Sequence, residues 1–174
     1  MTTLRRNELT PEEYPNFYHT YVSCVPAELT LDDALTNSYR RLTDYFADLP
    51  PTKHDYAYAL GKWTVAQALQ HIVDTERVFA YRALRIGRGD TTPLPGFDQE
   101  LFASSAPQCP AVGDLLTEFE WLRQSTRALF ASFDAEALGR TGTASGGSVS
   151  TRALGFILSG HIYHHVRIYR GLYV

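Results

Sequence analysis

Residues 154–170, with the sequence LGFILSGHIYHHVRIYR, decide the fold because their apolar side chains recur at the spacing of an α-helix. At 3.6 residues per turn, one stripe of this helix contains the apolar residues Leu154, Ile157, Leu158, Ile168 and Leu172. His161 and His165 fall within the same stripe, at positions where a helical bundle would bury leucine. The segment therefore predicts a long helix that carries two histidines on its buried face.

The spacing of His161 and His165 has two interpretations. Imidazoles at positions i and i+4 project from one face of a helix about one turn apart, so two ring nitrogens can bind one divalent cation. Alternatively, each is a hydrogen-bonded core residue, which is the commoner state of a single histidine on an apolar stripe. Two of them, with His164 beside them, are harder to satisfy in this way, because each neutral ring needs a partner for both nitrogens. The pair therefore favours a metal or catalytic site.

The composition is that of an ordinary globular protein. The chain has 174 residues, 44% of them hydrophobic, which is enough for one domain over residues 1–174 to bury a core without disulfide bonds. The formal net charge of −3 leaves no excess of positive charge for a nucleic-acid backbone. Cys24 and Cys109 lack the spacing of a zinc ribbon or a redox dithiol, so two reduced thiols are expected. Without an apolar signal segment or a membrane-spanning run, the sequence predicts a cytoplasmic protein.

Capping residues mark the first two of four expected helices. Thr30 can cap a helix that continues until Pro50 stops it. The second helix opens with a capping box formed by Thr64 and Gln67. Residues 1–27 precede both helices without steady periodicity, so they are expected to form an irregular arm across the fold.

Two longer connections separate the remaining helices. Residues 87–110 contain several prolines and glycines and are expected to be a structureless crossover over one end of the fold. A third helix is expected over residues 112–132, and a flexible glycine-rich loop over residues 139–148 then leads to a cap at Ser150 and the histidine helix. No segment shows the alternation of apolar and polar residues that would predict a β-strand. The fold class is therefore all-α, a four-helix bundle with a long crossover between its second and third helices.

A metal site in a helical bundle takes its ligands from facing helices, so a third ligand is expected on another helix. The other histidines are His19 in the arm, His54 after the first helix and His71 in the second helix. On a helical wheel His71 lies away from the apolar stripe, where an ordinary surface histidine would also lie. Periodicity alone leaves the role of His71 open.

Several short motifs occur in a specific order along the chain. They are GKWT at residues 61–64, HIVDTERVFAYR at 71–82, GRGD at 87–90, PLPGFD at 93–98 and GHIYHH at 160–165. From about residue 30 to 170 the chain resembles the DinB-like proteins, which also include thiol-cofactor-dependent transferases. The resemblance implies an up-down-down-up bundle, commonly a homodimer, in which His71, His161 and His165 are the metal ligands.

Three neutral imidazoles leave coordination positions open for water or substrate, unlike a closed four-ligand structural site. We therefore expect a divalent metal ion, with zinc or nickel as the first candidates. The expected function is that of a metal-dependent hydrolase or a thiol S-transferase acting on a small molecule, with a low-molecular-weight thiol as cofactor in the second case. The alternative is a non-enzymatic metal-binding or stress-response dimer whose metal is structural or sensory.

Two acidic residues follow His71 closely. Asp74, one turn away, is a candidate catalytic residue that orients an imidazole or transfers a proton, but surface pairing with Arg77 or Arg82 would explain it equally well. Glu76 points toward the apolar stripe and needs a partner such as an arginine.

Two further expectations concern the surroundings of the site. Tyr81, Arg82 and Asp98 are candidates to line its mouth, although the proline-rich segment serves packing equally well. His164 is expected outside the ligand set, because it points in a different direction from His161 and His165 on the helix.

Overall fold

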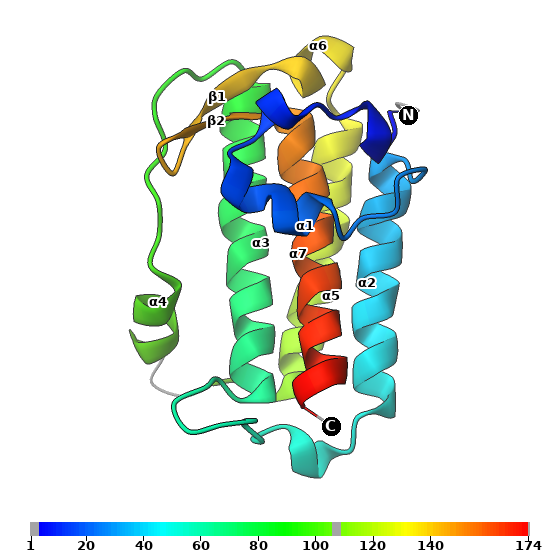
Figure 1. Ribbon diagram of the computed structural model, residues 1–174, viewed down its shortest axis with the longest axis vertical. Coiled ribbons are helices and arrows are strands. Elements are labelled where there is room, and N and C mark those ends of the chain that lie inside the picture. The colour runs from blue at the N-terminus through cyan, green and yellow to red at the C-terminus, as the bar shows by residue number, and fades with distance from the viewer. Residues whose placement is uncertain (1–3, 106–108, 174) are drawn as a thin grey trace.

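The computed structural model describes residues 4–105 and 109–173, in which four long helices lie side by side (Figure 1). These helices are α2 (Leu31–Asp48), α3 (Val65–Gly87), α5 (Val112–Ala131) and α7 (Thr151–Leu172). In the view of Figure 1, α2 and α7 run downward while α3 and α5 run upward. Both α2 and α3 pack against α5 and α7. Since α3 and α5 are parallel neighbours, the chain must return along the bundle between them. The predicted, mostly helical fold is confirmed.

The helices begin at the predicted caps. The Thr30 hydroxyl accepts a hydrogen bond from the Asp33 amide at 3.2 Å. Thr64 and Gln67 form the reciprocal capping box, with distances of 3.2 and 2.9 Å. The Ser150 side chain caps α7 in the same way. These caps satisfy backbone amides that have no partner within the helix, and they fix where α3 and α7 start.

The N-terminal arm is more regular than its sequence indicates. It contains three 3-10 helices, Arg6–Glu8, Pro11–Glu13 and Asn16–Tyr18, and the short helix α1 (His19–Val22). Helix α1 packs against α7 (Figure 1). Gly160 permits this contact, because a Cβ atom there would lie 2.0 Å from the carbonyl oxygen of Tyr21. The arm thus covers the histidine helix at close range; residues 1–3 of the expected arm lie outside the described residues.

The loop expected at residues 139–148 is largely a β-hairpin. Strand β1 (Thr141–Ala144) pairs antiparallel with β2 (Gly147–Ser150). The turn places Ser145 at φ 52° and Gly146 at φ 79°, the left-handed conformations that suit a two-residue hairpin turn. The expectation that no strand would form was wrong, because strands of four residues are too short to show a convincing alternation of apolar and polar side chains.

The crossover at residues 87–110 is not structureless, as was expected. It contains α4 (Gln99–Ser105), which lies beside α3 (Figure 1). Before α4, the Leu94 amide donates to the Thr143 carbonyl at 2.9 Å, and the Leu94 carbonyl accepts from the Ser145 amide at 3.1 Å. The crossover is therefore tied to the hairpin; its residues 106–108 lie outside the described part of the chain.

The core consists of two hydrophobic clusters stacked along the bundle. On α7, Ile157 and Leu158 belong to one cluster and Ile162 to the other, with His161 between them. On α3, the change of cluster occurs at the buried polar residue Thr75. A layer of polar side chains thus interrupts the apolar core at mid-height. Within the described residues, no helix is long and apolar enough to cross a membrane.

Candidate metal centre

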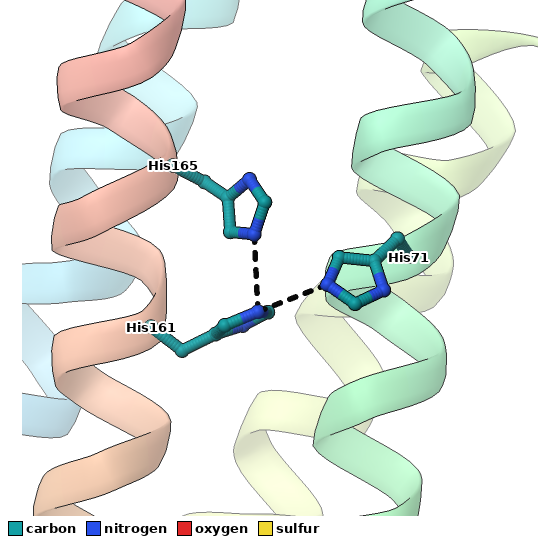
Figure 2. Close-up of side chains that lie close together, drawn as sticks. All are labelled: His71, His161 and His165. Atoms are coloured by element: carbon teal, nitrogen blue, oxygen red, sulfur yellow. Dashed lines mark hydrogen bonds between the residues drawn. The ribbon is translucent and has the colours of Figure 1, made fainter. Parts of the chain in front are cut away.

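Three histidine side chains from two helices converge in this polar layer (Figure 2). The Nε2 atom of His161 lies 3.0 Å from Nε2 of His71 and 3.0 Å from Nε2 of His165. One ring nitrogen from each histidine lies within 4.8 Å of the other two. His71 comes from α3, and the other two lie one turn apart on α7. The structure brings together the three histidines that the resemblance implies.

Hydrogen bonding alone does not account for this arrangement. A ring nitrogen of a neutral imidazole either carries one proton or offers one lone pair. Nε2 of His161 therefore cannot donate to one neighbour and accept from the other. By contrast, two nitrogens that each lie about 2.1 Å from a shared metal ion are about 3.0 Å apart when the angle between them is about 90°. The donor set fits a divalent cation that accepts imidazole ligands.

Burial keeps the three imidazoles neutral. It lowers the pKa of His71 to about 4. Burial also holds the pKa of His161 and the pKa of His165 well below the ordinary value, and the neighbouring histidines lower both further. Only a neutral imidazole has a lone pair for a metal ion. The site is therefore ready to bind a cation at neutral pH without first releasing protons.

The facing ends of α3 and α7 are joined by two tyrosines. The Tyr169 hydroxyl donates to the Val65 carbonyl at 3.1 Å, and the Tyr173 hydroxyl donates to the Trp63 carbonyl at 2.8 Å. The Trp63 ring packs 4.9 Å from the ring of His71. These contacts set the position of His71 opposite α7. His71 lies off the main apolar stripe because α3 is buried against both α5 and α7, so its buried surface is wider than one stripe.

The arm forms one side of the site. The Tyr21 ring meets the His161 ring edge to face at 5.3 Å and the His164 ring at 5.2 Å. His164 itself points toward Arg167, whose guanidinium lies 3.5 Å from His164 Nδ1, and it is not part of the converging group. Sequence reasoning missed Tyr21, because the arm has no periodicity that would show which of its side chains face the bundle.

Three hollows meet at the histidines. The first is lined by His71 and Asp74, the second by His71 and His161, and the third by His165. Gln99, the first residue of α4, lines all three. Gln99 could not be identified from the sequence, because its place depends on how the crossover folds back over α3.

Asp74 lies beside Arg77, and this surface pairing is the alternative that the sequence left open to a catalytic role. Its carboxylate accepts a hydrogen bond from Gln70 at 3.0 Å and lies 3.5 Å from the Arg77 guanidinium. Burial nevertheless raises the pKa of Asp74 above the ordinary value. In the described part of the chain it makes no hydrogen bond to an imidazole, although it lines the hollow beside His71.

The three residues expected at the mouth make contacts elsewhere. Tyr81 is exposed and contacts Arg85. Asp98 accepts hydrogen bonds from the first amides of α4. Arg82 is buried and donates to the Pro95 carbonyl at 2.8 Å, which holds the crossover against α3. None of these three side chains lines the hollows at the histidines.

Comparisons with known proteins agree with this architecture. The family model of the DinB superfamily matches residues 34–168. Among solved structures, a similar fold occurs in YfiT from Bacillus subtilis, with 18% sequence identity and a TM-score of 0.68 over 80% of this chain and 84% of that chain. YfiT is described as a probable metal-dependent hydrolase with an unusual four-helix bundle topology. At this identity the likeness shows the fold alone. No curated protein matches the sequence.

Proposed function

This chain belongs to the DinB superfamily, and on that premise we propose that it is a divalent-metal-dependent hydrolase of a small molecule. The observation that carries the proposal is the convergence of the His71, His161 and His165 Nε2 atoms beside hollows large enough to admit a ligand. The description of YfiT as a probable metal-dependent hydrolase supports the same reaction class. Zinc and nickel are the metals we propose, because both accept imidazole ligands.

The proposed roles of the protein groups follow from their surroundings. When bound, a divalent cation supplies Lewis-acid activation of a nucleophile at neutral pH. The three imidazoles would hold the cation as neutral ligands, and the Trp63 and Tyr21 rings would keep water from two sides of them. Asp74 is the proposed proton-transfer group, since it lines the hollow beside His71 and its pKa is raised by burial.

A structural metal fits these surroundings less well. Structural zinc sites are closed by four protein ligands. In the described residues only three candidate ligand side chains converge, and the hollows leave the fourth side open.

Thiol S-transfer is the second form of the proposed chemistry, in which a low-molecular-weight thiol replaces water as the nucleophile. We also assign the bundle the up-down-down-up topology, on the helix directions in Figure 1, and a homodimer remains a prediction.

The test uses protein purified without a metal-binding tag and loaded with zinc or nickel. Turnover of small esters, amides and epoxides is measured with and without an added low-molecular-weight thiol. We expect a chelator and His165→Ala each to abolish turnover while the circular dichroism of the helices is retained. Dependence of turnover on the thiol would select transfer over hydrolysis. Cooperative loss of helix on chelation would contradict the enzymatic proposal in favour of a structural metal, because binding energy would then be folding energy.

A further inference from the structure

The second hollow is an aromatic cavity that extends from the histidines toward the hairpin. It has a volume of about 190 Å³. Its histidine end is formed by His71 and His161, and its far end by Tyr18, Phe79, Phe97 and Ser145. An apolar cavity of about 150 Å³ is known to hold benzene. The cavity therefore has room for a single aromatic ring, or a short chain, with one or two small substituents.

A buried cation lies behind the far end of this cavity. Arg82 is 1% exposed, and its guanidinium lies 4.9 Å from the Phe79 ring centroid and 5.8 Å from that of Phe97. The other fully buried arginine, Arg123, is paired with the carboxylate of Glu76. Over residues 4–105 and 109–173, Arg82 has no such carboxylate partner. Since a buried charge is costly unless it is paired, this guanidinium favours an anion nearby.

Arg82 also orients two hydroxyl groups of the cavity wall. Its guanidinium donates to the Ser145 hydroxyl at 2.8 Å and to the Tyr18 hydroxyl at 3.4 Å. An arginine has only donors, so both hydroxyl oxygens act as acceptors and keep their own protons for another partner. In the described residues neither hydroxyl donates to a protein acceptor. Both residues line the cavity, so an acceptor group placed there can receive both protons.

A third hydroxyl lies along the same wall. Thr75, one turn after His71 on α3, is 4% exposed, and among the residues that the structure describes its Oγ1 atom has no hydrogen-bond partner. Thr75 also lines the cavity. A buried hydroxyl without a partner is destabilising, so an acceptor group of a ligand in the cavity would stabilise Thr75 by accepting its hydrogen bond.

From these contacts we infer that the cavity is the substrate-binding site and that it takes a small organic anion. The carboxylate of this anion lies against the Tyr18 and Ser145 hydroxyls in front of Arg82. Its ring or short chain fills the aromatic cavity, and its reactive end points toward His71 and His161. The inference rests on the proposed function only for the placing of the reacting end.

The test compares three ligands of similar shape and different charge on the metal-free protein at neutral pH, so that none can bind through a metal. The probes are benzoate, benzamide and benzylamine. Their binding is measured by calorimetry and by changes in the amide chemical shifts of Thr75 and Ser145. We expect benzoate to bind at least about tenfold more tightly than benzamide, because hydrogen bonds to a charged group are the stronger ones. Benzylamine should not bind. Equal affinity of benzoate and benzamide, or shifts that avoid both residues, would overturn the inference.

Matched variants test the hydroxyl groups themselves. Tyr18→Phe removes a hydroxyl that contacts Arg82, whereas Tyr39→Phe removes one on α2 that is not among the residues lining the cavity. Ser145→Gly removes the second hydroxyl at a position whose positive φ suits glycine. We expect Tyr18→Phe and Ser145→Gly to weaken benzoate binding about tenfold and Tyr39→Phe to leave it unchanged. Equal losses for both tyrosine variants would contradict the assignment.

Zinc titration separates this inference from the proposed function. If the wild-type protein prefers benzoate but does not bind zinc, the result contradicts the metal-dependent reaction and supports the anion site. If the protein binds zinc but shows no preference for benzoate, the result contradicts only the anion site.

Discussion

The guanidinium of Arg123 on α5 donates two hydrogen bonds to the carboxylate of Glu76 on α3, at 2.8 and 2.7 Å, in the interior of the bundle. It also donates to the Leu35 carbonyl at 2.6 Å and to the Ser38 hydroxyl at 2.9 Å on α2. One buried ion pair therefore joins three of the four long helices. The arginine partner that the sequence predicts for Glu76 is present.

Glu76→Gln is expected to lower the free energy of unfolding by about 3–5 kcal/mol, because it leaves the buried Arg123 without its counter-charge. Urea denaturation followed by circular dichroism measures the change. Asp32→Asn is the matched control, since Asp32 makes the same type of two-bond contact with Arg127 where both side chains are about 40% exposed. That variant should cost about 1 kcal/mol or less. Equal losses for the two variants would show that burial is not what makes the Glu76 pair important.

Helix boundaries could be predicted from the sequence because their causes are local. A capping side chain such as Thr64 acts within three residues of itself, and Pro50 directly follows the C-cap of α2 because proline cannot continue a helix. The i and i+4 spacing of His161 and His165 is also local, so this candidate ligand pair can be identified from the sequence alone. Periodicity did not identify His71, because its burial depends on how α3 packs against two neighbours. The resemblance to the DinB-like proteins implied it.

The parts that could not be predicted depend on contacts between distant segments. Gln99 follows a segment of the crossover that is held by the hydrogen bond from Arg82 to the Pro95 carbonyl and by the pairing of Leu94 with the hairpin. The hairpin itself rests on two left-handed residues at its turn, Ser145 and Gly146, where the sequence shows only a glycine-rich stretch. Periodicity carries no information about such contacts.

Gly160→Ala is expected to displace α1 from α7. A Cβ atom at this position would lie 2.0 Å from the Tyr21 carbonyl oxygen, a backbone atom that cannot move without the rest of α1. We expect a loss of about 1–3 kcal/mol in stability and faster hydrogen exchange of the α1 amides. Gly171→Ala on the same helix is the control, because no atom of the described residues lies within 4 Å of its Cβ position, and it should be neutral or stabilising by up to about 1 kcal/mol. Unchanged exchange in Gly160→Ala would contradict the close contact.

Acid should destabilise the metal-free protein through the histidines. The pKa of His71 is about 4 in the folded protein and about 6.5 in the unfolded chain, so the unfolded chain binds protons more readily between these values. Stability is therefore fully present above about pH 6.5 and falls toward pH 4, by about 3 kcal/mol for His71 alone. Urea denaturation across this range measures the slope. His71→Asn should make the slope shallower; an unchanged slope would mean that His71 titrates normally in the folded state.

Calorimetric titration of the metal-free protein with zinc tests the central claim most directly. We expect one zinc ion per chain in the wild type and a loss of affinity of more than about 100-fold in His71→Ala, His161→Ala and His165→Ala. His164→Ala, which changes a neighbouring histidine outside the converging group, should bind zinc as the wild type does. Wild-type protein that binds no zinc or nickel, or binding that survives His165→Ala and is lost in His164→Ala, would contradict the three-histidine site.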